Sequence, residues 1–345
     1  MFASISASGT VGIAVLGAGR IGACHAANVA RAVPGARLVG VADIDLAAAE
    51  RAVDAAGTGR ATTRYDEPLA EPAVDAVIVA TPTATHAVLM ADAARAGKHI
   101  LCEKPIALTV EETRAAIESV RHADVLVQIG FNRRFDPPFV RAREAIARGD
   151  IGQPWMVKLV GRDPRLAPLS YLAASGGQFK DQAIHEFDAA RWLIGREVEE
   201  VYAMGAVLVD PAVGELGDVD TALTTLRFAG GALGQVDSCR RSVYGYDIRA
   251  EVLGSEGALM IGDGRRTAVT LLEPNRASHD HVDWFLERFA TAYRDEAADF
   301  VDCVRTGRTP RAGVEDGLEA LRVAVAAGQS QRERRPVRLE EVHDG

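Results

Sequence analysis

The sequence predicts two domains: a doubly wound α/β domain with a parallel sheet, then an α+β domain with a large, mostly antiparallel sheet. In the first part of the chain, short β-branched runs alternate with helical segments, which is typical of parallel strands joined by crossover helices. From Trp155 onward, strand-like runs follow one another across short turns, which favours antiparallel pairing. We place the domains at residues 1–131 and 132–345, and the C-terminal helices can pack back on the first.

The start of the first domain has the pattern of a dinucleotide-binding unit. An apolar run, Gly12–Leu16, leads into G-x-G-x-x-G, a helical segment follows, and a second apolar run ends on Asp43. Gly17 permits a tight turn, Gly19 lets the backbone approach a pyrophosphate, and Gly22 lets helix and strand pack closely. The acid follows at about the expected offset of roughly 20 residues. An ordinary glycine-rich turn is the alternative.

Later elements of the first domain follow from periodicity and capping signals. We expect helices at 21–32, 46–56 and 86–96, and strands at 38–42, 74–80, 99–103 and 125–130. Thr109 and Glu112 form a predicted capping box that opens another helix.

The second domain is expected to begin with a helix at 138–148. Six strands should follow, with one inserted helix, Gln178–Leu193; the strands are expected at 155–161, 198–209, 221–228, 232–240, 249–254 and 258–261. Residues 228–231 and 254–257 have the composition of hairpin connections. Helices at 283–305 and 313–328 and a strand at 336–339 end the chain.

Composition and charge limit the partners. The formal net charge of -9 argues against nucleic acid or an anionic membrane as the main partner. No apolar run is long enough to span a membrane, and residues 1–10 do not resemble a signal peptide but a short, loosely held tail. Four widely spaced cysteines disfavour a disulfide framework or zinc ribbon and suit a reducing cytoplasm.

A lysine at the end of a predicted strand is the first candidate for chemistry. Lys104 follows the strand 99–103, so it should lie at the carboxyl edge of the sheet, where ligands bind in doubly wound folds. Pro105 follows, and this X-Pro bond could be cis. The alternative is a solvated lysine at a strand terminus.

The helix at 178–193 carries the second candidate. Asp181, His185, Asp188 and Trp192 share one face of an ideal helix, and Asp181 and His185 are neighbours at i,i+4. A carboxylate beside an imidazole raises its basicity, which suits a histidine that takes a proton from an alcohol. The alternative is an ion pair of Asp181 and His185 on a solvent-exposed helix face, without a catalytic role. A metal site is not expected, because no third and fourth ligand is evident.

Taken together, these motifs resemble one family. Gly17-Ala18-Gly19-Arg20-Ile21-Gly22, Thr81-Pro82 with His86, Glu103-Lys104-Pro105 and Gly176-Gly177 with Asp181 and His185 occur in the order seen in Gfo/Idh/MocA dehydrogenases of sugars and cyclitols. The segments 133–136 and 244–248 are most similar to the inositol 2-dehydrogenase branch. The resemblance covers nearly the whole chain.

The resemblance implies site residues. Lys104, Asp181 and His185 match the catalytic positions, with His185 as general base, Asp181 orienting it and Lys104 binding the substrate oxygen. The implied cofactor-binding residues are Gly17, Ala18, Gly19, Arg20, Ile21, Gly22, Asp43, Thr81, Pro82, His86, Glu103 and Lys104. The implied substrate-binding residues are Lys104, Arg133, Asp163, Asp181, His185 and Tyr246. One departure is that Gly161 and Asp163 stand where the inositol branch tends to have His and Asn.

These expectations combine into one function. Asp43 should accept hydrogen bonds from the adenosine ribose, and no Arg or Lys follows it directly, so NAD is expected rather than NADP. We expect an NAD-dependent dehydrogenase that oxidises a secondary hydroxyl of a cyclitol, cytoplasmic and, by the resemblance, homotetrameric. A dehydrogenase of aldoses, glycosides or aminocyclitol precursors is the alternative enzyme. A dinucleotide-binding sensor without turnover is the alternative outside enzymes.

Overall fold

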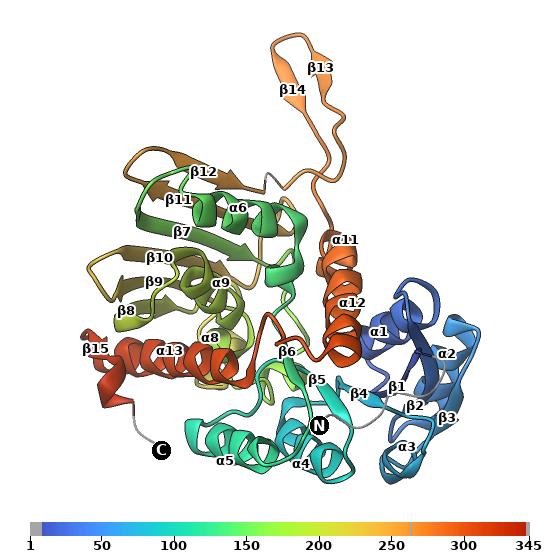
Figure 1. Cartoon of the computed structure of the whole chain (residues 1–345). Coiled ribbons are helices and arrows are strands. Elements are labelled where there is room, and N and C mark those ends of the chain that lie inside the picture. The colour runs from blue at the N-terminus through green and yellow to red at the C-terminus, as the bar shows by residue number, and fades with distance from the viewer. Residues whose placement is uncertain (1–8, 263, 343–345) are drawn as a thin grey trace. The chain divides into compact units, whose positions relative to one another are not determined.

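The computed structural model describes residues 9–262 and 264–342 and divides them into two compact units (Figure 1). The first unit contains residues 9–135 and Thr291–Leu318. The second contains residues 136–290 and 319–342. Residues 1–8, which hold most of the predicted N-terminal tail, lie outside the described residues.

The first unit is built on a six-stranded parallel sheet with the order β3-β2-β1-β4-β5-β6. The strands are β1 (Val11–Leu16), β2 (Ala36–Ala42), β3 (Arg60–Thr62), β4 (Ala76–Val79), β5 (His99–Glu103) and β6 (Val127–Gly130). Strand order reverses between β1 and β4, and ligands bind at the carboxyl ends of such strands. This confirms the predicted doubly wound domain.

Helices complete this unit on both faces of the sheet. They are α1 (Arg20–Arg31), α2 (Leu46–Ala56), α3 (Asp66–Ala70), η1 (Thr83–Thr85), α4 (His86–Arg95), α5 (Val110–Arg121), η2 (Asn132–Phe135) and α12 (Ala290–Thr306). Helices α1, α2 and α12 share one apolar core with the strands, which buries Val29, Ala49 and Phe300. The side-chain oxygen of Thr109 accepts a hydrogen bond from the backbone N–H of Glu112, so the predicted cap of α5 is present.

The second unit is built on a seven-stranded sheet with the order β12-β11-β7-β10-β9-β8-β15. Its strands are β7 (Pro154–Arg162), β8 (Val198–Ala206), β9 (Thr221–Phe228), β10 (Leu233–Cys239), β11 (Asp247–Gly254), β12 (Ala258–Ile261) and β15 (Val337–Arg338). Neighbours are antiparallel except β7 and β10, which are parallel. The predicted mostly antiparallel sheet is therefore confirmed.

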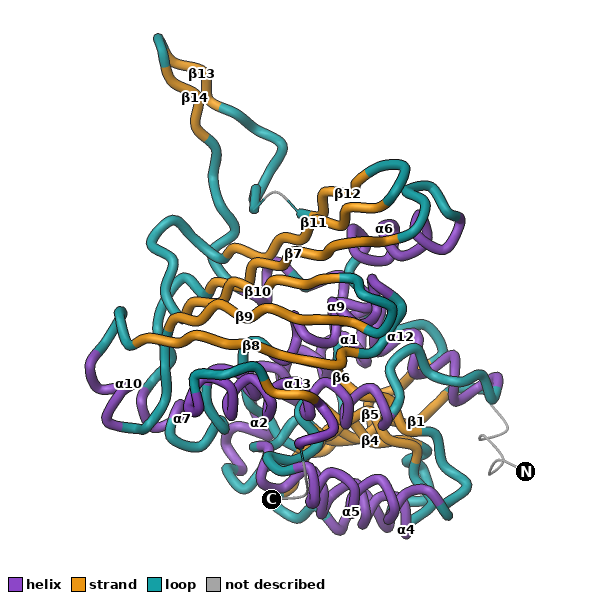
Figure 2. Tube along the Cα trace, turned by 90° about the vertical axis from the view of Figure 1, so that its left-hand side faces the viewer, coloured by secondary structure: helices purple, strands orange, loops and turns teal. Residues whose placement is uncertain are grey.

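Helices cover one face of this sheet, and the other face is open (Figure 2). Helix α9 (Ile184–Ile194) packs on β7 and β10, and α6 (Pro137–Arg148) packs on β12 and α9. The other helices of this unit are α7 (Leu169–Leu172), α8 (Gln178–Asp181), α10 (Pro211–Glu215), α11 (Phe285–Arg288), η3 (Leu339–Glu341) and most of α13 (Val314–Glu333). Side chains alternate along β9 and β10 between buried and exposed, as expected when one sheet face is covered.

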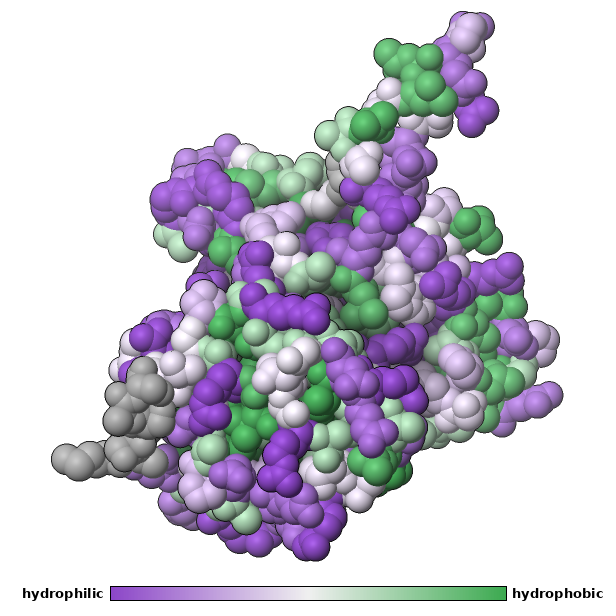
Figure 3. All heavy atoms as spheres, turned by 90° about the vertical axis from the view of Figure 1, so that its right-hand side faces the viewer, coloured by the Kyte–Doolittle hydropathy of each residue, from purple (hydrophilic) through white to green (hydrophobic). Residues whose placement is uncertain are grey.

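A hairpin that the sequence did not predict extends from the second unit. Strands β13 (Leu271–Glu273) and β14 (Arg276–Ser278) form a separate two-stranded sheet. Its exposed side chains include Val269, Leu271 and Leu272. Figure 3 shows these hydrophobic atoms on the projection at the top of the view.

Two predicted helices are interrupted. The expected helix Gln178–Leu193 is wrong as a single element, because it consists of α8 and α9. At the break, the N–H of Ala183 bonds to the carbonyl of Gln178, five residues back, while that of His185 bonds to Gln182, three residues back. The expected helix at 283–305 is likewise two helices, α11 and α12, with Phe289 between them.

Candidate active site

The glycine turn of the first unit has the geometry that a dinucleotide requires. Gly17 has a φ of 99°, and a Cβ there would lie 2.6 Å from the backbone of Ala80. A Cβ on Gly22 would lie 1.9 Å from the carbonyl oxygen of Gly17, whereas a Cβ on Gly19 meets nothing within 4 Å. Gly17 and Gly22 therefore close the turn, and Gly19 leaves open space beside the start of α1, where amide N–H groups favour phosphate.

The end of β2 places Asp43 against this turn. One carboxylate oxygen of Asp43 accepts a 2.6 Å hydrogen bond from the backbone N–H of Ala18. The other oxygen accepts a 2.9 Å bond from the N–H of Asp45. The acid predicted from spacing is thus fixed beside the glycines, as needed to contact the ribose of a bound dinucleotide.

The loop after β4 is anchored by a buried histidine. The ring nitrogens of His86 each lie 2.8 Å from a carbonyl oxygen, Nδ1 from that of Pro105 and Nε2 from that of Thr81. Burial lowers the pKa of His86, so the ring is neutral at pH 7. His86 therefore joins the segment Thr81-Pro82 to the segment that carries Lys104.

Lys104 directly follows the end of β5, at the carboxyl edge of the parallel sheet. The Lys104–Pro105 peptide is cis, as the sequence allowed. In the preceding residue, Glu103, a carboxylate oxygen accepts a 3.0 Å hydrogen bond from Nε2 of His25. The carboxyl edge of this sheet thus brings together the predicted residues from Gly17 to Gly22, Asp43, Thr81 and Lys104.

The two arginines after β6 differ in their surroundings. Arg134 donates to the carboxylate of Asp316 at 2.7 Å and to the carbonyl oxygen of Arg311 at 2.7 Å. Arg134 therefore links η2 to the first turn of α13 and to the segment just before it. Arg133, the predicted substrate-binding residue, is also buried.

In the second unit, the carboxyl ends of two parallel strands carry the polar side chains. Arg162 of β7 is paired in register with Cys239 of β10, so Asp163 and Arg240 follow at the same edge. The side-chain amide of Gln182 donates to a carboxylate oxygen of Asp163 at 2.9 Å and to the carbonyl oxygen of Cys239 at 3.0 Å. Gln182 lies at the helix break and fixes Asp163 there.

Asp181 has two strong side-chain partners. The hydroxyl of Tyr171 donates to Oδ1 at 2.8 Å, and Nη1 of Arg240 donates to Oδ2 at 3.0 Å. Arg240 is almost completely buried and also lies 3.5 Å from Asp218. His185 lies in the first turn of α9, four residues after Asp181, and both residues are partly buried.

Tyr246 and Gly161 lie beside or on β11 and β7, which are neighbours in the second sheet. Tyr246 directly precedes β11, where Asp247 pairs with Arg162, and its ring packs edge-on against Phe289. A Cβ on Gly161 would lie 2.5 Å from a carboxylate oxygen of Glu186. Glu186 thus takes the space that a side chain at 161 would need.

Sequence reasoning did not assign roles to Tyr171, Gln182 and Arg240. Arg240 was expected inside the strand 232–240, whereas the structure ends β10 at Cys239 and places Arg240 directly after it. Tyr171 lies in a segment without clear periodicity, so its contact with Asp181 could not be foreseen.

The fold and the glycine turn with Asp43 are those of a dinucleotide-binding oxidoreductase with a second, α+β unit. Residues 11–131 match the description "Oxidoreductase family, NAD-binding Rossmann fold", and residues 143–339 match "Oxidoreductase family, C-terminal alpha/beta domain". The chain belongs to this Gfo/Idh/MocA family and is an NAD-dependent oxidoreductase.

The chain is similar to known proteins over nearly its full length. The chain is 43% identical to myo-inositol 2-dehydrogenase of Thermotoga maritima over 332 residues, 96% of this chain and 99% of that protein. It is also 43% identical to scyllo-inositol 2-dehydrogenase (NAD(+)) of Bacillus subtilis, over 95% and 96% of the two chains. The structure of scyllo-inositol dehydrogenase from Lactobacillus casei with NAD(H) and scyllo-inositol matches with a TM-score of 0.90 and 28% identity, covering 96% and 99%.

Within the described residues, no helix is long and apolar enough to cross a membrane.

Proposed function

We propose that this chain oxidises one secondary hydroxyl of a cyclitol, of the myo-inositol or scyllo-inositol type, to the ketone. The observation that carries the proposal is the 43% identity of the chain to two inositol 2-dehydrogenases over nearly its full length. Lys104, Asp181 and His185, the catalytic positions that the family resemblance implies, are present in the sequence. Bound NAD accepts the hydride from the carbinol carbon. The residues of this chain bind the polyol and move its proton.

His185 acts as general base on the reacting hydroxyl. It lies in the first turn of α9, which packs on β7 and β10, so its backbone is rigid. An imidazole is the side chain most often used to take a proton from a reacting hydroxyl. Asp181 orients the histidine, and Lys104 hydrogen-bonds the same substrate oxygen and stabilises negative charge that develops on it.

Other residues select the polyol. Arg133, Asp163 and Tyr246 line the substrate, with Asp163 fixed by Gln182. The adjacent Gly161 and Asp163 differ from the residues typical of the inositol branch, which keeps an aldose, a glycoside or an aminocyclitol precursor as the alternative substrate class.

A panel of polyols tests the proposal. With saturating NAD and either myo-inositol or scyllo-inositol as substrate, the enzyme should form NADH. The absorbance of NADH measures the rate. Faster turnover with glucose, a glycoside or an aminocyclitol would transfer the assignment to the alternative substrate class. If the protein binds NAD but turns over no polyol of the panel, the alternative of a dinucleotide-binding sensor is supported instead.

The open face of the second sheet supports self-association. Leu233 of β10 and Leu253 of β11 both pair with Met156 of β7, so they form an apolar row across three strands. Leu223, Met204 and Met260 are also exposed on this face. We assign this face to contacts within a homotetramer. Leu233→Arg should lower the molar mass measured by light scattering, whereas Val88→Arg, at an exposed site on α4, should not.

A further inference from the structure

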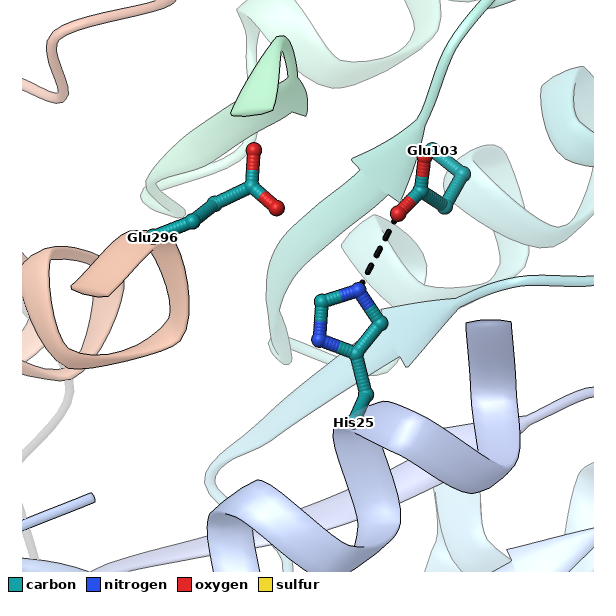
Figure 4. Close-up of side chains that lie close together, drawn as sticks. All are labelled: His25, Glu103 and Glu296. Atoms are coloured by element: carbon teal, nitrogen blue, oxygen red, sulfur yellow. Dashed lines mark hydrogen bonds and ion pairs between the residues drawn. The ribbon is translucent and has the colours of Figure 1, made fainter. Parts of the chain in front are cut away.

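Three ionisable side chains from three elements meet in the interior of the first unit (Figure 4). His25 comes from α1, Glu103 from the end of β5 and Glu296 from α12. One ligand-type atom from each lies within 4.8 Å of the other two. His25 and Glu296 are fully buried, and the side chain of Glu103 is 13% exposed.

Glu296 is the unusual member. Both of its carboxylate oxygens are buried and make no hydrogen bond, and Figure 4 shows the carboxyl group directed toward His25 and Glu103. Across residues 9–262 and 264–342, Glu296 has no ion-pair partner. A buried carboxylate without a partner costs several kcal/mol, and the ordinary response is to hold a proton.

The charged groups around Glu296 favour the same protonation state. Burial, followed by the charges of Glu103 and Asp299, raises the pKa of Glu296 well above its usual value. Asp299, one turn along α12, is already paired with Arg308 and Arg311. From α1, Cys24 has a pKa raised to about 11 and stays a neutral thiol.

The neighbouring strand and the histidine supply no fixed positive charge. From β6, Gln128 donates its amide to the backbone oxygen of Glu296 and brings no charge. His25, which faces the cluster from α1, is bonded to Glu103.

We propose that Glu296 carries a proton in the working enzyme and serves as a positioning residue for Glu103 and, through it, for Lys104. The Glu296 and Glu103 carboxyl groups lie within 4.8 Å of each other without a hydrogen bond between them. After a rotation of the Glu296 side chain, its neutral carboxyl group can donate the O–H to Glu103, while the His25 N–H donates to the same carboxylate. The side chain of Glu103 is then held between α1 and α12. This fixes the backbone position from which the side chain of the next residue, Lys104, extends. An ionised Glu296 would instead place a second negative charge beside Glu103. This inference rests on the proposed role of Lys104.

Glu296→Gln and Glu296→Ala separate a neutral hydrogen-bonding role from an ionised one. The glutamine keeps the shape and the donor of a protonated acid, so kcat should change by no more than about threefold, whereas the alanine should lower kcat by about tenfold or more. Glu50→Gln removes an exposed carboxylate from α2 and is the matched control. A glutamine variant as impaired as the alanine variant would overturn the proposal.

Infrared difference spectra provide a readout that needs no substrate. The wild type should show the carbonyl stretch of a protonated carboxylic acid near pH 7, and Glu296→Gln should lack that band. This measurement keeps the inference testable if the polyol panel fails. An absent band in the wild type would contradict the proposal. So would one equivalent of a divalent metal that is found by elemental analysis and lost in Glu296→Gln, because Glu296 would then be an ionised ligand.

Discussion

A carboxylate oxygen of Asp43 lies 2.6 Å from the backbone nitrogen of Ala18, in the middle of the glycine turn. This bond fixes the acid at the end of β2 beside the start of α1. The side chain is held by the fold itself, so the proposed contact of this carboxylate with the adenosine ribose needs no rearrangement of Asp43.

Replacement of Asp43 should alter the choice of cofactor. A 2′-phosphate about 4 Å from this carboxylate would be repelled by roughly 4 kcal/mol at an effective dielectric constant near 20, before screening. We therefore expect wild-type kcat/KM to favour NAD over NADP by at least about tenfold. Asp43→Ser should narrow this ratio, and Glu50→Gln should leave it unchanged. Equal efficiency of the wild type with both cofactors would contradict the prediction.

Two glycines of the turn should respond differently to alanine. Gly22→Ala puts a Cβ 1.9 Å from the carbonyl oxygen of Gly17, so we expect loss of NAD binding together with a lower melting temperature. Gly19→Ala meets no atom within 4 Å and has an ordinary negative φ, so the fold should tolerate it. The methyl group would instead occupy space needed by the pyrophosphate and should weaken NAD binding. Calorimetric titration measures the NAD affinity of both variants, and thermal melts measure their stability. An equal fall in melting temperature for Gly19→Ala and Gly22→Ala would contradict the prediction.

Removal of the proposed base should affect turnover more than cofactor binding. His185→Ala should lower kcat by roughly 10²–10⁴-fold at neutral pH, the usual contribution of general base catalysis. NAD affinity should stay near the wild-type value, because the glycine turn belongs to the other unit. Steady-state kinetics and NAD fluorescence titration measure the two quantities. Near-normal turnover would exclude His185 as the base.

Arg240 should act on catalysis through Asp181. Its guanidinium is 3.0 Å from Asp181 and nearly fully buried, so it holds the carboxylate in one orientation. Arg240→Gln should lower kcat by about tenfold or more, and Arg240→Lys should restore part of it because the charge is kept. Tyr171→Phe removes the other hydrogen bond to Asp181 and should have a smaller effect. If both arginine variants change KM alone, Arg240 contacts substrate and does not position Asp181.

Local sequence signals predicted the elements and the residues that follow them. Gly17, Gly22 and Asp43 were found because strand, turn, helix and acid follow one another within a short stretch. The break between Asp181 and His185 was missed because helical periodicity continues across it, and only the hydrogen bonds of Ala183 and His185 reveal the interruption. The cluster of His25, Glu103 and Glu296 was missed for another reason, since its members come from distant segments that only folding brings together.

The buried Glu296 should make stability depend on pH in a defined direction. Its folded pKa is raised above the unfolded value near 4.5, so between these values the folded state binds one proton more than the unfolded state. The contribution of Glu296 to the free energy of unfolding is therefore fully present below about pH 4.5. As pH rises above this value, the contribution falls by about 1.4 kcal/mol per pH unit until the folded pKa is reached. Glu296→Gln lacks this proton, so it should gain stability relative to the wild type as pH rises. Denaturation of both proteins at several pH values from about 5 to 8 measures the difference in their free energies of unfolding. Parallel stability curves would show that Glu296 titrates alike in the folded and unfolded states.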